Sequence, residues 1–533
     1  MRRMKARSAM DWVTVLLLSI LVLTVSLGAR SANPQQKVRQ AGVAGSFYPA
    51  DPTVLSAMID DMLAHAKPPA IDGPIYAVVA PHAGYQYSGP VAAYTYAALK
   101  GRKFSRVVVI APSHYVAFDF TSVYDGDAYA TPLGTIPVDK AFAKELVKMD
   151  PTSKLSNRGH DPTPEGAEHA IEVQLPFLQR VLGSFTLVPI VMGDQSYENS
   201  RDLGVALAKL VHGGDTLIVA SSDLSHYHPY DDAVRIDHKT LNALQVWDYF
   251  SMSQNFQTRV WEACGGAPIV AAMIAAERMG ANRAVLLKYA NSGDVTGDHS
   301  RVVGYSAVVL TKTPGQQAAE RPFSLDASDK DELLGVARVS VEYAVREKKL
   351  YEPPTVSSGT LDQERGVFVT LKEAGALRGC IGYSSAVKPV YLAVRDTATL
   401  SALRDPRFPP VTAAELGRLA YEISVLSPLR RVQDIQQIQV GQDGLLMKNG
   451  AQEGLLLPQV PVEKKWDRQK FLQETCAKAG MHSNCWKEEN TDIFLFTAVV
   501  FDQRAPEVTM PEMPVSPGPS TWPAAPAPSQ PRH

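Results

Sequence analysis

The stretch IYAVVAPHAGY, residues 75–85, decides the fold of the first half of this 533-residue chain. An apolar run stops at Pro81 and is followed at once by His82. The same order recurs in VVVIAPSH (residues 107–114) and LIVASSDLSH (residues 217–226), where a histidine again closes the motif. Continuous apolar runs of this length are typical of strands buried on both faces of a sheet. The three motifs therefore predict neighbouring buried strands with polar residues at their ends.

Apolar runs and amphipathic segments alternate on both sides of these motifs. Such alternation is typical of an α/β domain, in which helices cover both faces of a mostly parallel sheet. We predict that this domain spans residues 38–311. Its strands are expected at residues 75–80, 106–111, 186–191, 216–221, 284–289 and 302–310, and its helices include residues 52–66, 138–149, 170–182 and 200–211.

A second domain is expected after a linker. Residues 312–329 are polar, contain Pro and Gly and have no sustained period, as linkers do. In residues 330–503 strands and helices do not alternate regularly, which favours the α+β class. The proline-rich residues 504–533 predict a tail without a packed core. The second domain's strands are expected at residues 366–371, 421–426, 444–448 and 493–501, and its helices at residues 330–347, 387–399 and 468–479.

The first 32 residues predict export. Basic residues precede an apolar run at residues 12–27, and small residues follow it, which is the order of an export signal. The run is short for a bilayer crossing of about 20 residues, so a cleaved signal is favoured and a retained anchor is the alternative. We expect an exported protein that is either periplasmic or anchored in the membrane and faces the periplasm or the outside.

The charge balance makes two classes of partner unexpected. Lys and Arg number 53 and Asp and Glu number 55, which gives a formal net charge of -2. Binding to nucleic acid or to an acidic membrane needs an excess of basic side chains. We therefore expect no nucleic-acid partner and no membrane contact apart from the N-terminal segment.

Four cysteines are too few for a disulfide scaffold in so long an exported chain. Cys476 and Cys485 are close enough in sequence to form one disulfide. Cys264 and Cys380 fall in different predicted domains. Each of these two thiols needs an explanation of its own.

The ends of the predicted strands are where a ligand site is expected in an open α/β sheet. His82, His114 and His226 each follow one of the three apolar runs. Imidazole binds zinc, copper and iron, and a thiolate is its soft companion. Cys264 is the candidate thiol, because two glycines follow it and the helix expected at residues 268–278 would lower the pKa of a thiol near its start.

Several motifs of the first domain resemble the Memo family, a relative in fold of the class III extradiol dioxygenases. They are APHAGYQYSGPVAAYTY, VIAPSHY, EHAIEVQLPFL, SSDLSHYHPY, EACGGAPI and SGDVTGDHSRVVGYSA. The resemblance implies a metal site formed by His82, His114 and Cys264, with Asp223 and His226 beside it as further ligands or acid/base groups. We expect His226 to transfer protons or orient a ligand, with the Asp223 carboxylate fixing its tautomer. His169 is expected to line the same cleft.

The implied ligands favour certain metals and certain reactions. Two imidazoles and a thiolate suit copper or iron, and zinc is possible. The expected function is that of a metal-dependent redox protein acting on a small molecule or on the metal itself, and the alternative is a non-catalytic module that captures a peptide or small molecule. Extradiol cleavage is less expected because it requires iron held by two histidines and a carboxylate, and Cys264 stands in the carboxylate's place.

The second domain resembles the AMMECR family in LRGCIG, DPRFPPV, GLLLPQV and the run from Trp466 to Gly480. This resemblance implies an α+β fold and a candidate binding surface for a small molecule or peptide at Arg378, Gly379 and Cys380. The fusion is similar to proteins B and A of the AmmeMemoRadiSam system, which implies a radical SAM protein as a further partner. The expected export would separate the chain from a cytosolic partner of that kind.

Overall fold

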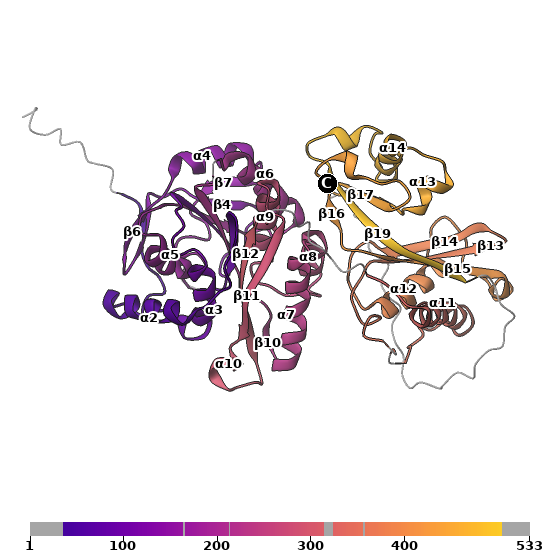
Figure 1. Cartoon of the computed structure of the whole chain (residues 1–533), viewed down its shortest axis with the longest axis horizontal. Helices are drawn as coiled ribbons and strands as arrows, with labels where there is room; N and C mark the ends of the chain where they lie inside the picture. The colour runs from indigo at the N-terminus through magenta and orange to yellow at the C-terminus, as the bar shows by residue number, and fades with distance from the viewer. Residues whose placement is uncertain are drawn as a thin grey trace, which may run out of the picture.

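The computed structural model describes residues 36–163, 166–212, 214–313, 323–354, 356 and 358–503. Figure 1 shows two domains, the first coloured indigo to magenta and the second orange to yellow. The expected signal at residues 1–32, the tail at residues 504–533 and most of the linker lie outside the described residues. Among those that are described, no helix is both long and apolar enough to cross a membrane.

A nine-stranded mixed sheet forms the centre of the first domain. Four neighbouring strands in its middle are parallel, and nearly all of their side chains are buried. All but one of the pairings outside this centre are antiparallel, so the prediction of a mostly parallel sheet applies to its centre only. The central strands are β2 (Ile75–Ala80), β9 (Thr216–Ser221), β3 (Arg106–Pro112) and β8 (Thr186–Met192); the others are β10 (His226–His228), β11 (Arg283–Asn291), β12 (Val302–Thr311), β4 (Thr121–Tyr124) and β7 (Ser153–Ser156).

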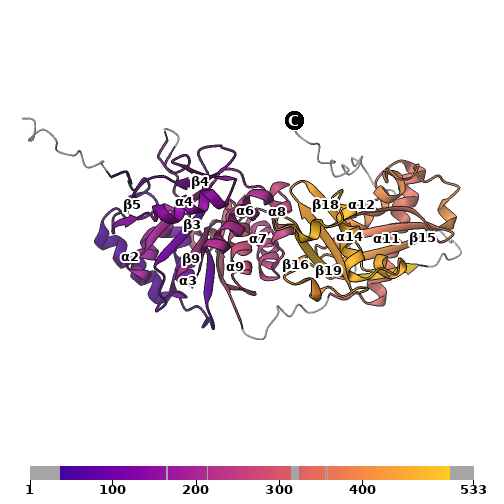
Figure 2. The same ribbon diagram turned by 90° about the horizontal axis from the view of Figure 1, so that it is seen from above.

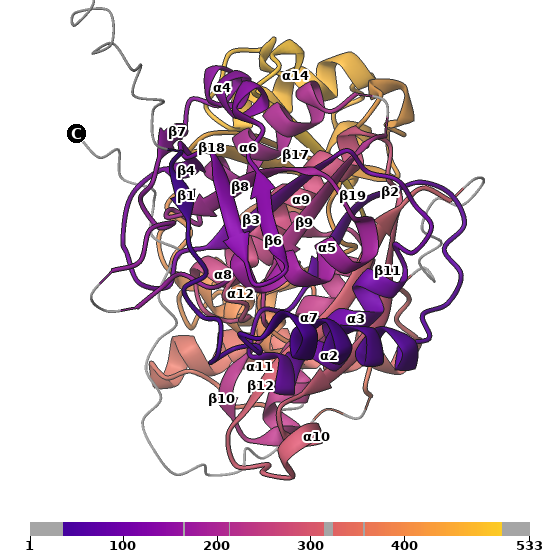
Figure 3. The same ribbon diagram turned by 90° about the vertical axis from the view of Figure 1, so that its left-hand side faces the viewer.

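Helices cover both faces of this sheet (Figure 3), as expected of an α/β domain. Along each strand alternate side chains enter two separate apolar cores, one on each face. The helices of one core are α2 (Pro52–His65), α3 (Tyr85–Ala97) and α5 (Leu175–Leu182); those of the other are α4 (Lys140–Met149), α6 (Tyr197–Leu210), α7 (Tyr230–Gln245), α8 (Tyr249–Gln257) and α9 (Gly266–Arg278). A small sheet of β1 (Val38–Arg39), β5 (Ala128–Thr131) and β6 (Gly134–Pro137) and the short α10 (Gly293–Thr296) complete the domain.

The second domain contains a seven-stranded antiparallel sheet, which confirms the α+β class. Its first two strands form a hairpin, with Ala374 and Gly375 at positive φ in the turn. The strands, in spatial order, are β14 (Ala376–Tyr383), β13 (Val367–Glu373), β15 (Leu419–Leu426), β19 (Asp492–Gln503), β17 (Asp443–Asn449) and β18 (Gln452–Leu456), and β16 (Arg430–Arg431) pairs with β19. The helices are α11 (Ala327–Glu347), α12 (Val390–Leu403), α13 (Gln459–Glu463) and α14 (Arg468–Lys478).

A disulfide joins Cys476 on α14 to Cys485 at the start of the 3₁₀ helix Cys485–Lys487. Because both sulfur atoms form this bond, neither is a thiolate that could bind a metal together with the nearby His482. Instead, His482 Nε2 lies 2.7 Å from the Glu488 carboxylate.

The two domains share an apolar core at their contact (Figure 2). Phe250 of α8 packs against Phe494 of β19, with ring centroids 5.2 Å apart. Buried charges lie beside this core. Asp492, only 4% exposed, accepts hydrogen bonds from Arg201 at 2.9 Å and from Arg278 at 3.0 Å. Each domain thus covers apolar and charged surface of the other.

Candidate metal centre

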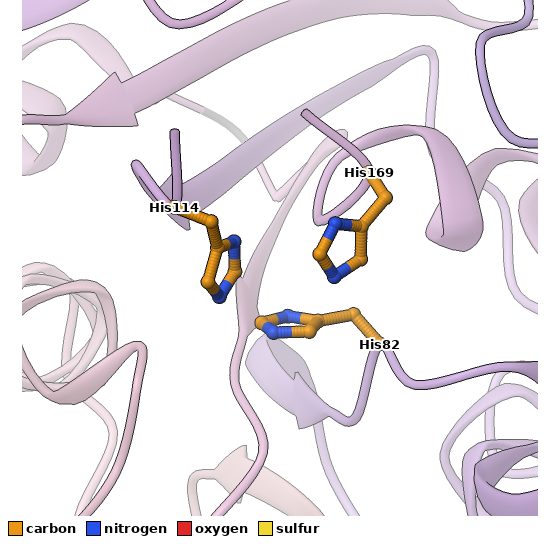
Figure 4. Close-up of side chains that lie close together, drawn as sticks. All are labelled: His82, His114 and His169. Carbon is orange, nitrogen blue, oxygen red and sulfur yellow. The ribbon is translucent and has the colours of Figure 1, made fainter. Parts of the chain in front are cut away.

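Three histidines meet beside the central strands of the first domain (Figure 4). His82 follows β2, His114 follows β3, and His169 lies in the loop before the 3₁₀ helix Glu172–Gln174. One ring nitrogen of each lies within 4.8 Å of those of the other two. The ring centroids are 4.7 to 5.4 Å apart. This group can hold a metal ion.

The hydrogen bonds around Ser221 determine which nitrogen of His82 is free. The Ser221 hydroxyl donates to the Ala170 carbonyl at 2.6 Å and accepts from Gln174 Nε2 at 2.8 Å. Since its only proton is used, it must accept from His82 Nδ1, which lies 2.9 Å away. The lone pair of His82 is therefore on Nε2, where a metal can bind it.

Glu168 orients His114 in the same way. Its carboxylate accepts from the backbone N–H of His114 at 2.7 Å and lies 3.0 Å from His114 Nδ1. Burial lowers the pKa of His114, but the hydrogen bond and charge of Glu168 outweigh it, and the net change is an increase. The same contact lowers the pKa of Glu168 to about 2 despite burial. Nδ1 thus carries the proton and Nε2 is open. The one sign of this role in the sequence is a carboxylate directly before His169.

His169 is the third ring of the group, and its surroundings keep it neutral. Its Nδ1 is buried and has no hydrogen-bond partner among the described residues. Burial, together with His82 and His114, lowers its pKa to about 3, so the ring is neutral near pH 7. Burial and the charge of His114 also lower the pKa of His82 well below its usual value. Three ring nitrogens this close together are donors of the kind that zinc, copper and iron prefer. The donor set therefore fits a metal ion.

Cys264 lies next to this group. Its Sγ is 3.1 Å from His82 Nε2 and accepts the backbone N–H of Asp223 at 3.2 Å. Gly265 permits this approach, because a Cβ atom there would lie 2.3 Å from the Ser221 carbonyl oxygen. The expected lowering of the thiol pKa is wrong: burial and the nearby Asp223 carboxylate raise it, and they outweigh the effect of the helix start. The histidine that completes the three-membered group is His169, and Cys264 adjoins it through His82.

Asp223 and His226 have separate partners. The buried Asp223 carboxylate accepts the backbone N–H of His82 at 2.8 Å, and burial raises its pKa. His226 Nδ1 lies 2.8 Å from the Leu224 carbonyl oxygen. The tautomer of His226 is therefore fixed by Leu224 and not, as expected, by Asp223, whose carboxylate turns toward the His82 backbone. His226 and Cys264 both line an open cleft of about 750 Å³.

Comparison with known proteins identifies both domains. Residues 39–309, half of the chain, match the family model described as Memo-like protein. The chain belongs to the Memo family. Residues 334–501 match the AMMECR1 family model, so the second domain is an AMMECR1 domain. Both family resemblances are thereby confirmed.

Several archaeal relatives cover the Memo domain. A MEMO1 family protein of Methanopyrus kandleri is 40% identical over 285 residues, which are 51% of this chain and 99% of that protein. Another, from Sulfolobus acidocaldarius, is 36% identical over 288 residues, 51% of this chain and 98% of that protein. Among solved structures, that of an uncharacterized protein from Pyrococcus horikoshii matches another share of the sequence: it covers 33% of this chain and 91% of its own, with 42% identity and a TM-score of 0.32.

The AMMECR1 domain uses its three candidate residues in internal contacts. Arg378 Nε donates to Glu415 at 2.7 Å. Gly379 packs so closely that a Cβ atom there would lie 2.2 Å from the Ser401 carbonyl oxygen. The Cys380 thiol accepts from Thr370 at 3.3 Å, and burial raises its pKa. These are the contacts that the three residues make in β14, and a ligand at this surface stays a prediction.

Proposed function

We propose that the Memo domain binds a copper or iron ion between His82, His114 and His169 and acts as a metal-dependent redox protein. The meeting of three imidazoles carries this proposal, because one ring nitrogen of each lies within 4.8 Å of those of the other two. In His82 and His114 the hydrogen bonds at Nδ1 leave the lone pair on Nε2. Nitrogen donors with a thiol at hand suit copper and iron, and zinc remains the alternative metal. Cys264 is proposed as a further donor, since its Sγ lies beside His82 Nε2.

A bound copper or iron ion would supply electron transfer or Lewis acidity. The chain's own residues would bind the substrate and move protons. His226 holds a proton on Nδ1 against Leu224, which leaves Nε2 for exchange with a molecule in the cleft. Asp223 holds the His82 backbone in place. At about 750 Å³ the open cleft fits a small molecule or a short piece of peptide.

The second candidate is a binding module without turnover. The size and openness of the cleft support it, because capture of a peptide needs only such a surface. Extradiol cleavage is not proposed. Its iron site needs a carboxylate beside two histidines, and Glu168, the carboxylate that contacts the His114 ring, already accepts several N–H groups.

The proposal places the protein outside the cytosol. The export pattern of residues 1–32 and the disulfide between Cys476 and Cys485 both support an oxidising compartment. In that compartment the protein would not meet a cytosolic radical SAM enzyme. The proposed partner is therefore a small molecule or peptide.

Metal analysis of the purified full chain tests the proposal. We expect about one copper or iron ion per chain, and a sharp loss in His82→Ala, His114→Ala and His169→Ala, because each removes one donor. The matched control is His238→Ala, which alters an exposed histidine of the same domain. His226→Ala should keep the metal and lose any turnover that is found. A native protein that takes up neither Cu²⁺ nor Fe²⁺ would contradict the proposal.

A further inference from the structure

The segment between α8 and α9, residues 258–265, carries Cys264 to the metal centre, and we name it the cysteine loop. Its own domain holds the end nearest the thiol. Gly265 N donates to Ser222 Oγ at 2.9 Å, and Gln195 Nε2 donates to the Cys264 carbonyl at 3.0 Å. These bonds fix the last residues of the loop and leave its middle to other contacts.

The AMMECR1 domain holds the middle of the cysteine loop. The Trp261 side chain is buried, and its Nε1 donates to Glu364 Oε2 at 2.8 Å. The other oxygen of Glu364 accepts from Lys239 Nζ of α7 at 2.6 Å. One carboxylate of the second domain therefore ties the cysteine loop and α7 together. A hydrogen bond to a buried carboxylate is among the stronger kinds.

Two more contacts reach the start of the loop from the second domain. Asn255 Nδ2 donates to the Ala386 carbonyl at 2.8 Å, and Ser385 Oγ donates to Gln254. The Asn255 carbonyl in turn accepts the backbone N–H of Val260 at 2.9 Å. Displacement of the second domain would consequently break contacts both at Asn255, which is bonded to the loop, and at Trp261 within it.

Trp261 belongs to the apolar core that the two domains share and also borders open space. It lines the cleft that His226 and Cys264 line, and a cavity of about 400 Å³ where the two domains meet. In the same loop, Arg259 has a φ of 57°, in the left-handed region. A residue with a side chain keeps such a backbone only where the surroundings impose it. Both features indicate a loop whose shape depends on its hydrogen bonds.

We propose that the AMMECR1 domain positions the metal centre, with Glu364 acting through Trp261 to hold Cys264 against His82. The use of Cys264 as a metal donor rests on the proposed function, whereas its placement can be measured without a metal. Loss of the Glu364 contact releases the cysteine loop into the adjoining cleft and exposes the thiol. Glu364 and Trp261 are thus positioning residues, which act through Cys264.

The alkylation rate of each free thiol by iodoacetamide, measured by mass spectrometry on the metal-free full chain, tests this inference. We expect Cys264 to react about tenfold faster in Glu364→Gln and in Trp261→Phe, the factor that loss of one hydrogen bond to a charged group implies. The rate at Cys380 should stay constant, as an internal measure of folding. The control Glu489→Gln removes an ion pair between the domains that does not touch the loop, and should change neither rate.

Unchanged Cys264 rates in both variants would overturn the inference. A rise at Cys380 equal to that at Cys264 would overturn it too, because it would indicate general opening of the chain. A parallel titration with Co²⁺ separates the two proposals. Failure of the wild-type protein to bind Co²⁺ would count against the proposed function alone, while the alkylation rates would still decide the role of Glu364.

Discussion

Replacement of Glu168 by glutamine tests how the metal centre is oriented. The carboxylate faces four N–H groups: Nδ1 and the backbone of His114, and the backbones of His169 and Ala170. A carboxamide has one acceptor oxygen, so at least one of these donors loses its partner and the others lose a charged one. A hydrogen bond to a charged group contributes about 1.5–3 kcal/mol. We therefore expect Glu168→Gln to weaken metal binding about 10- to 100-fold, as loss of a ligand's orienting partner does.

The assay is a competition titration of the full chain with a coloured chelator, using Zn²⁺ and Cu²⁺. Glu145→Gln is the matched control, because Glu145 is an exposed carboxylate on α4 that pairs with Lys148 of the same helix. The control should change affinity by less than about twofold, since an exposed ion pair contributes little. Wild-type affinity in Glu168→Gln would refute the reasoning that the carboxylate orients His114.

Three further predictions concern pH and stability. Glu168 raises the pKa of His114, and a metal must displace the proton of a protonated His114. Metal affinity should therefore be constant above that pKa and fall about tenfold per pH unit below it. An affinity that does not change between pH 8 and about pH 5 would contradict this. Asp492→Ala removes the buried carboxylate that two partly buried arginines share and should destabilise the chain by about 3–5 kcal/mol in urea unfolding, whereas a loss below about 0.5 kcal/mol would show these ion pairs to be unimportant. Replacing Cys476 and Cys485 by serine should cost about 2–3 kcal/mol and leave Co²⁺ uptake intact, and loss of Co²⁺ uptake would link the disulfide to the metal centre.

The centre of the fold could be predicted because buried parallel strands need unbroken apolar runs. The runs at residues 75–80, 106–111 and 216–221 match β2, β3 and β9 to within one residue. The short strands β4 and β7 contain Ser, Thr and Lys and have no apolar run. The sequence pattern therefore does not predict them. The contact between the domains could not be predicted from the sequence either. A sequence shows that Phe250 and Phe494 are apolar, but not that each packs against the other.

The metal centre could be predicted where its residues end strands. His82 and His114 occupy such positions, and the structure brings their rings within 5.1 Å. His169 comes from a loop, and only the folded chain places it and Glu168 beside residues more than 50 positions earlier. The pKa of Cys264 went against expectation because a helix start is a local feature, whereas burial depends on every element packed around the thiol.

X-ray absorption at the metal edge of the loaded full chain tests the central claim most directly. With Zn²⁺ bound, we expect imidazole scattering with nearest nitrogens at about 2.0–2.1 Å, and a sulfur at about 2.3 Å if Cys264 is a donor. In His169→Ala one imidazole should be missing from the spectrum. An oxygen-only shell without imidazole scattering, or identical spectra for the wild type and His169→Ala, would contradict a metal held by His82, His114 and His169.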